Sequence, residues 1–143
     1  MQPGTSPEWI AALVRKYRTL VAWRHERSMG LEPPDASAFR RLAREFPGAL
    51  RELTVEPIET LTRRLSALET ASGDPHRIEP WMLWMWDYHA ETRTLLRSFA
   101  SDRRADRSRE SMRDHVVGRV ARRHGVPSLV VLAALFPARE RRR

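Results

Sequence analysis

The sequence predicts an all-α fold, a single-domain bundle of about five to seven helices with short connections that contain proline or glycine. Three observations carry this prediction. Apolar residues recur at helical spacing over most of the chain, and prolines and glycines separate the periodic segments. No segment alternates apolar and polar residues as a strand does. We expect one helical domain over residues 1–137 and a basic tail, ARERRR, over residues 138–143.

The N-terminal half is expected to contain four helices. The first begins at Pro7 after the capping residue Ser6, because proline needs no amide hydrogen at the first helical position, and it ends near Gly30. The other three are expected at residues 35–46, 47–53 and 57–72, with Asp35 as a cap. The inward stripe of the first helix consists of Trp9, Ile10, Leu13, Val14, Tyr17, Leu20 and Val21. That of residues 35–46 consists of Phe39, Leu42, Ala43 and Phe46, and that of residues 57–72 consists of Ile58, Leu61, Leu65 and Leu68.

Three of the five tryptophans lie in residues 79–91, EPWMLWMWDYHAE, which open a helix expected over residues 80–99. At about 100° per residue, most of the aromatic side chains share one face that burial explains. That face carries Trp81, Trp84, Met85, Tyr88, Thr92, Leu95 and Phe99. An adjoining face carries Met82, Trp86, His89 and Arg93. We favour burial of Trp86 under a neighbouring element, where Arg93 could make a cation–π contact, over a pocket or partner anchor.

The same helix carries two carboxylates, Asp87 and Glu91, one turn apart on its polar face. Such a pair could bind a metal or act as acid and base. However, the chain has no Glu-x-x-His or His-x-x-x-His pair to complete a metal site. A haem or quinone site at His89 is disfavoured because one histidine and methionines at helical spacing are typical of a core. We therefore expect a solvated face, no metal and no cofactor.

No catalytic motif is found in the chain. It lacks cysteine, a G-x-S-x-G elbow and the glycine-rich loops that cradle phosphates, which excludes disulfides, thiol catalysis and nucleotide sites of those types. The N-terminus does not read as a signal peptide, and the longest apolar run, residues 129–136, is shorter than the roughly 20 residues that span a bilayer. We expect a cytoplasmic protein without a membrane segment, in which binding is favoured over catalysis.

The last third is expected to form two helices separated by a turn at Gly125. The first covers residues 106–124, and the second is short, beginning at Pro127 and closed by Pro137. The inward residues of the first are Met112, Val116, Val117, Val120 and Ala121.

The segment VVGRVARRHGVPSLVVLAALF resembles the helix-turn-helix pattern of bacterial DNA-binding domains. The resemblance rests on Val120-Ala121, Gly125-Val126 and Val131, over about twenty residues. The second helix departs from that family, because its outward positions are Pro127, Ser128, Leu129, Leu132 and Ala133, which cannot make the bidentate contacts that read bases. We favour an amphipathic helix joined by the Gly-Val-Pro turn to a buried helix.

The charge is concentrated near the C-terminus. Residues 101–143 hold twelve basic and five acidic residues, while the whole chain has a net charge of +8. All but one of the basic residues are arginine, as expected if a GC-rich genome favours arginine codons, and Lys16 is the exception. If the last helices and the tail lie close together, arginines could line one surface for phosphates of nucleic acid. These are Arg103, Arg104, Arg107, Arg109, Arg119, Arg122, Arg123, Arg139, Arg141, Arg142 and Arg143.

Three functional hypotheses follow from these patterns. The first is a non-catalytic binding or regulatory protein that contacts nucleic acid or another acidic partner through these arginines. The second is a protein–protein adaptor, or a self-associating helical module, that uses Trp86 and Trp23 as exposed aromatic residues. The third is a small-ligand carrier or enzyme with a site near Trp86, His89 and Arg93.

Overall fold

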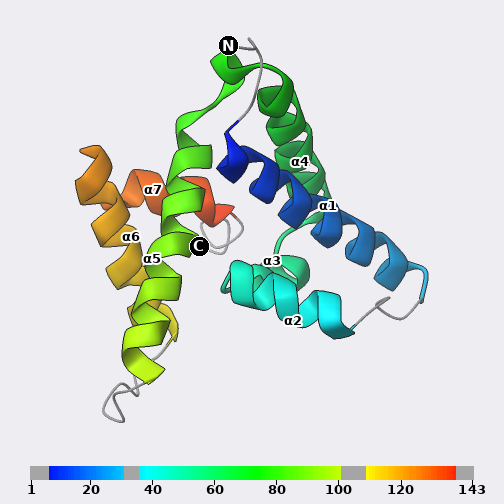
Figure 1. Cartoon of the computed structure of the whole chain (residues 1–143), viewed down its shortest axis with the longest axis horizontal. Coiled ribbons are helices and arrows are strands. Elements are labelled where there is room, and N and C mark those ends of the chain that lie inside the picture. Colours follow the sequence, from blue (N-terminus) through cyan, green and yellow to red (C-terminus); the bar gives the residue numbers. More distant parts are fainter. Residues whose placement is uncertain (1–6, 31–35, 101–108, 138–143) are drawn as a thin grey trace. The chain divides into compact units, whose positions relative to one another are not determined.

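The computed structural model describes residues 7–30, 36–100 and 109–137 (Figure 1). In these ranges the chain forms seven α-helices, one 3-10 helix and no strand, which confirms the all-α prediction and its number of helices. The expected cap at Asp35 and the tail over residues 138–143 lie outside the described ranges. Contacts divide the chain into two compact units, Met1–Met82 and Leu83–Arg143, and each is described by itself. One domain over residues 1–137 stays a prediction.

The first unit is built around the long helix α1. It contains α1 (Glu8–Ser28), α2 (Ala36–Glu45), α3 (Ala49–Val55), α4 (Ile58–Gly73) and the 3-10 helix η1 (Pro75–Arg77). α1 lies along α4 and also contacts α3 (Figure 1). The apolar core of these helices consists of Ile10, Ala12, Leu13, Val14, Tyr17, Leu20, Trp23, Leu42, Phe46, Ala49, Leu53, Leu61, Leu68 and Ala71. Of the predicted inward residues, Ile10, Leu13, Val14, Tyr17, Leu20, Leu42, Phe46, Leu61 and Leu68 are buried, whereas Trp9, Val21, Phe39, Ala43, Ile58 and Leu65 are half-buried.

Three prolines stand one residue before the helices that they introduce. Pro7, Pro57 and Pro127 have ψ angles of 149°, 148° and 144°, so each is extended and precedes the first helical residue. Their carbonyl groups accept the first hydrogen bonds of α1, α4 and α7. The expected helix starts at these prolines are therefore wrong by one residue, whereas Pro80 is the first residue of its helix as predicted.

The second unit contains most of α5 (Pro80–Ala100), together with α6 (Arg109–His124) and α7 (Ser128–Leu135). α6 and α7 pack against each other, and their buried apolar residues are Val116, Val117, Val120, Ala121, Val131 and Leu135. Gly125 ends α6 with φ +67°, and the amide of Val126 donates to the carbonyl of Ala121 at 3.0 Å. The predicted turn is confirmed. Among the described helices, none is long and apolar enough to cross a bilayer.

The buried face of α5 lies between the two faces expected from its sequence. Its buried residues are Met82, Met85, His89 and Thr92. Trp81, Trp84, Trp86 and Tyr88 are half-buried on either side of that line. Of the residues that the sequence assigned to the core, Met85 is buried as expected, whereas Trp81, Trp84 and Tyr88 are only half-buried. Large indole rings are seldom completely buried, and the thinner methionine side chains occupy the centre of the face instead.

Alanine at two glycines of the α6–α7 segment is expected to change stability in opposite directions. A Cβ atom at Gly118, inside α6, or at Gly125 would meet no atom within 4 Å, so only backbone conformation distinguishes the two positions. Gly118→Ala should stabilise by about 0.5–1 kcal/mol, and Gly125→Ala should destabilise by about 1–2 kcal/mol because of its positive φ. Urea unfolding measures both variants. A Gly125→Ala protein as stable as the wild type would contradict the left-handed turn.

Candidate functional site

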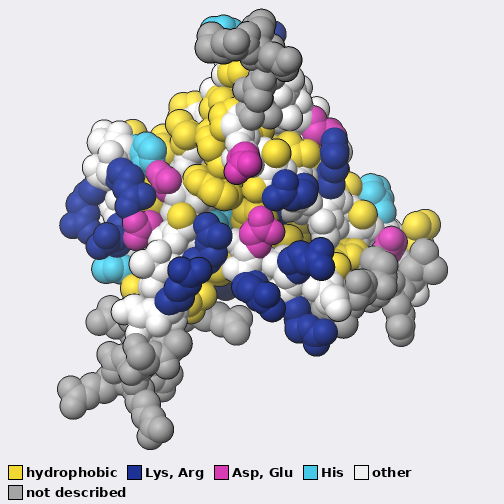
Figure 2. All heavy atoms as spheres, viewed as in Figure 1, with side chains coloured by type: hydrophobic (Ala, Val, Ile, Leu, Met, Phe, Trp, Pro, Cys, Tyr) yellow, Lys and Arg dark blue, Asp and Glu magenta, His cyan; other side chains and the backbone are white. Residues whose placement is uncertain are grey.

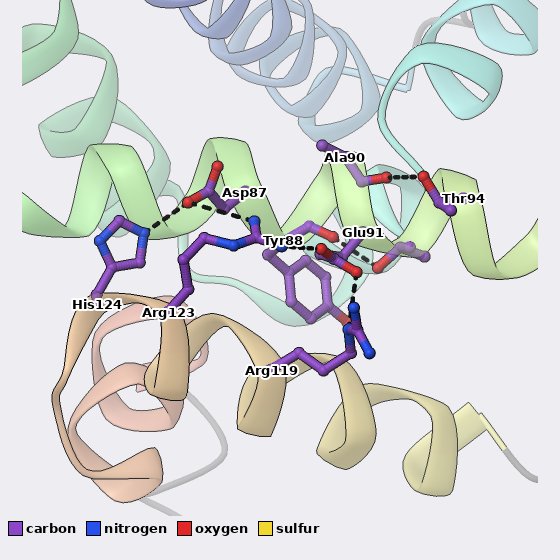
Figure 3. Close-up of polar contacts among 9 residues, drawn as sticks. Asp87, Tyr88, Ala90, Glu91, Thr94, Arg119, Arg123 and His124 are labelled. Atoms are coloured by element: carbon purple, nitrogen blue, oxygen red, sulfur yellow. Dashed lines mark hydrogen bonds and ion pairs between the residues drawn. The ribbon is translucent and has the colours of Figure 1, made fainter.

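Two carboxylates of α5 form one polar cluster with two arginines and one histidine of α6 (Figure 3). Arg119 Nε donates to Glu91 Oε2 at 3.1 Å, and Arg123 donates to the other oxygen of Glu91. Arg123 Nη1 also lies 3.8 Å from Asp87 Oδ2, and His124 Nε2 lies 2.5 Å from that same oxygen. The expected solvated face is therefore wrong for Asp87 and Glu91, whose side chains are only 24% and 16% exposed. Their i, i+4 spacing matches that of Arg119 and Arg123 on the facing helix.

The electrostatics of this cluster favour charged side chains on both helices. The hydrogen bond from Arg123, supported by the charge of Arg119, holds the pKa of Glu91 below its usual range. The same hydrogen bond raises the pKa of Arg123. Because the side chains of Arg119 and Arg123 are about half exposed, solvent screens the pairs, and each contributes about 0–1 kcal/mol to stability. The cluster fixes the positions of the side chains more than it stabilises the fold.

The lowered pKa of Glu91 predicts an acid-sensitive contribution to stability. A depressed carboxyl pKa stabilises the folded state above the ordinary value of 4.5, and this contribution is lost as the pH falls below it and through the folded pKa. Glu91→Gln should therefore reduce the unfolding free energy at pH 7 but change it little at pH 3. Chemical unfolding at the two pH values measures this difference. Glu59→Gln, at an exposed carboxylate of α4, is the control, and an equal loss for Glu91→Gln at both pH values would contradict the ion-pair explanation.

The arginines proposed for nucleic acid are only partly covered by the described structure. Seven of them lie outside the described residues: Arg103, Arg104, Arg107, Arg139, Arg141, Arg142 and Arg143. Arg109 opens α6, but its side chain is not among those described. Of the remaining three, Arg119 and Arg123 are held by Glu91 and Asp87, whereas Arg122 is exposed and has no ion pair with another described residue. The described part of α6 therefore carries fewer free positive charges than its sequence indicates.

The site that the sequence proposed near Trp86, His89 and Arg93 is only partly formed. The guanidinium carbon of Arg93 lies 5.7 Å from the ring centroid of Trp86, which confirms the expected cation–π geometry. Both side chains are half-buried. His89 is only 2% exposed, so it does not share an open surface with them. A ligand or partner reaching this face would meet Trp86 and Arg93 without the imidazole.

Trp23 is part of the core of the first unit. It is 4% exposed, and its ring stacks on Phe39 of α2 with ring centroids 3.7 Å apart and an interplanar angle of 7°. The expectation that Trp23 is an exposed aromatic residue is therefore wrong. Its position at the edge of the α1 stripe, which suggested exposure, is where α2 covers α1.

The turn between α6 and α7 is flanked by three exposed side chains, the charged Arg122 of α6 and the apolar Leu129 and Val130 of α7, which together we name the α6–α7 surface. Leu129 is 74% exposed and Val130 is 46% exposed. Val131 and Leu135 face the opposite way and are fully buried. The expectation of a buried second helix is therefore wrong on one side of α7. The residues predicted to face outward are apolar as expected, and Leu129 is the most exposed large apolar side chain among the described residues.

A buried polar cluster in the first unit escaped the sequence analysis. Lys16 Nζ lies 2.5 Å from Glu52 Oε2, and the hydroxyl of Tyr17 donates to Glu52 Oε1 at 2.7 Å. Arg64 Nη1 donates to the Tyr17 hydroxyl at 3.0 Å and lies 3.5 Å from Glu52 Oε1. All four side chains are at most 8% exposed. The cluster ties α1, α3 and α4 together around one carboxylate.

Burial controls the ionisation of this cluster. It lowers the pKa of Lys16, an effect that the charge of Glu52 partly offsets. It also raises the pKa of Tyr17 well above its usual range. One signal in the sequence could have revealed the cluster: the only lysine of an arginine-rich chain stands inside the apolar stripe of α1, beside Tyr17. A compact ammonium group suits a single buried carboxylate oxygen better than the broad guanidinium does.

Comparison with protein-family models, with curated proteins and with solved structures finds no match to this chain.

Proposed function

We propose that the chain is a non-catalytic protein-binding module that docks a partner protein on the α6–α7 surface. The observation that carries this proposal is the exposure of Leu129 and Val130 on a helix, Ser128–Leu135, that contains no charged residue. A helix that is apolar all round is normally buried, and burying one large apolar side chain is worth about 1.5–3 kcal/mol. Docking on this helix would remove that apolar surface from water.

The surroundings of α7 also support this proposal. Protein interfaces typically have an apolar centre and a polar rim in which arginine is common. Arg122 lies three residues before Gly125 and Leu129 lies four residues after it, so the exposed charge and the exposed apolar pair flank the same turn. The ion pairs with Asp87 and Glu91 fix Arg119 and Arg123 on α6, which reduces the entropy lost when a partner orders this helix.

A second candidate function is contact with phosphates of nucleic acid. It is favoured by the excess of basic residues over residues 101–143 and by the exposed Arg122. The apolar outward side of α7 argues for backbone contacts rather than base readout in that case.

Affinity retention with paired variants separates the two candidates. The full-length chain is immobilised and exposed to a lysate of the cells that produce it, before and after nuclease treatment. We expect one or more proteins to be retained by the wild type in both conditions and to be lost with Leu129→Ser/Val130→Ser. Leu96→Ser, at a leucine of α5 that is 42% exposed, is the matched control and should retain them. Retention that disappears with nuclease would favour the nucleic-acid candidate, and identical retention by the double variant would contradict docking on α7.

A further inference from the structure

The α6–α7 surface has a shape and a charge that specify its partner. At about 100° per residue, the outward-facing residues of α7 cover an arc of about 160°. This arc consists, in order, of Leu132, Leu129, Ala133 and Val130. Leu129 and Val130 are exposed, and Leu132 and Ala133 are half-buried. An apolar arc on a short helix is complementary to the apolar stripe of another amphipathic helix, where large side chains repeat at i, i+3 and i+4.

Basic and acidic side chains lie next to each other over α5 and α6 (Figure 2), and the charge left without an ion pair to a described residue beside the turn between α6 and α7 is the positive charge of Arg122. Arg122 is exposed beside the turn, and the side chains of Arg119 and Arg123 keep about half of their area exposed although they are paired. The part of the chain that contains them, residues 101–143, has twelve basic and five acidic residues. Two copies of the chain docked through their α7 helices would bring two Arg122 side chains to the same interface, and like charges that face each other oppose association. A negatively charged partner would instead be attracted.

We propose that the partner of the α6–α7 surface is an acidic amphipathic helix of another protein, whose apolar stripe covers Leu129 and Val130 and whose carboxylates face Arg122. This inference rests on the proposed protein-binding function and names the partner's chemistry. The apolar contact provides most of the affinity, and the carboxylates provide the selection between partners.

A pair of synthetic peptides of opposite charge tests the inference with the full-length protein. Both are about 14 residues long, or about four helical turns, and carry leucines at helical spacing. One has glutamate at the remaining positions and the other has lysine. Fluorescence anisotropy of labelled peptides is measured at low and high salt. We expect the acidic peptide to bind several-fold more tightly than the basic peptide at low salt, because the exposed Arg122 attracts glutamate and repels lysine.

Two variants assign the binding to named side chains. Leu129→Ser/Val130→Ser should abolish binding of the acidic peptide, and Arg122→Glu should weaken it several-fold and reduce its salt dependence. Leu96→Ser is the control and should bind as the wild type does. Because the substituted side chains are exposed, the variants should keep the helical content of the wild type, which circular dichroism verifies.

Each other outcome overturns a defined part of the inference. Equal binding of both peptides, lost with Leu129→Ser/Val130→Ser, would overturn the acidic partner and leave the proposed protein-binding function in place. If neither peptide binds, or if binding is unchanged in the Leu129→Ser/Val130→Ser variant, an amphipathic-helix partner is overturned. The proposed protein-binding function is then tested separately by the lysate experiment. A DNA duplex that binds more tightly than the acidic peptide, and does so through Arg122, would assign this surface to nucleic acid instead.

Discussion

Replacing Glu52 by glutamine is expected to reduce the free energy of unfolding by about 3–5 kcal/mol, because breaking a buried ion pair leaves an uncompensated charge in the interior. Lys16 loses the carboxylate oxygen that lies 2.5 Å from its ammonium group, and Arg64 loses the one at 3.5 Å. Neither cation can turn to solvent from its buried position. Urea unfolding followed by circular dichroism measures the loss.

The exposed ion pair between Arg18 and Glu69 is the matched control, because it also joins α1 to α4. Its oxygen and nitrogen lie 2.9 Å apart, but both side chains are more than 40% exposed, so Glu69→Gln should change stability by less than about 1 kcal/mol. Adding Lys16→Met to Glu52→Gln should recover part of the loss. If the double variant is less stable than Glu52→Gln alone, buried charge is not the cause.

The pH dependence of the Glu52→Gln variant provides a separate test. The pKa of Lys16 is already lowered by burial, and removing Glu52 lowers it further because the attraction that opposes burial is gone. Between that folded pKa and the ordinary value of 10.5, the unfolded chain binds more protons than the folded one, so stability rises with pH. The difference in unfolding free energy between the variant and the wild type should therefore shrink as the pH rises through this window. The comparison stops near pH 10, where Tyr17 ionises in the unfolded chain. A deficit that is constant with pH would contradict a charged Lys16.

Replacing Trp23 by alanine is expected to cost about 3–5 kcal/mol of stability, the usual range for removing a buried aromatic side chain. The ring is 4% exposed and stacks on Phe39, so its removal leaves a cavity between α1 and α2. Thermal or urea unfolding measures the effect. Partner binding by the folded fraction should not change, since Trp23 does not reach the surface.

Trp86→Ala is the companion variant for the Trp23 experiment. Trp86 is half-buried with the guanidinium of Arg93 at 5.7 Å, so its removal should cost about 1–2 kcal/mol, clearly less than that of Trp23. A Trp23→Ala protein that unfolds at the wild-type urea concentration but loses partner binding would restore Trp23 as an interface residue.

Local signals in the sequence were sufficient to predict the helices, but not to predict which side chains are covered by another helix. Periodicity identified the α1 and α4 stripes and Gly125 marked the turn, because each of these signals depends on the residues of one segment. Trp23 shows the limit of such reasoning. Its place at the edge of a stripe is compatible with exposure or burial, and only the position of Phe39 on another helix decides between them.

Charged residues were harder to interpret than apolar ones. Asp87 and Glu91 were expected to face solvent because the chain offers no further ligands at a spacing that would complete a metal site. Their actual partners, Arg119 and Arg123, lie about 30 residues away in the chain. The same pairing reduces the free positive charge that α6 seemed to offer when it was considered alone. The buried cluster around Glu52 combines residues from three helices, and a single sequence gives no register between helices.

The burial of Lys16 determines how the protein responds to amine chemistry. It is the only lysine of the chain, and its side chain is completely enclosed. Acylating reagents, acetyltransferases and ubiquitin ligases therefore find no accessible lysine side chain while the first unit is folded. Acylation of Lys16 should occur only in molecules whose first unit has opened, so the mass increment at this one residue measures the rate of opening in a mixture or in a cell.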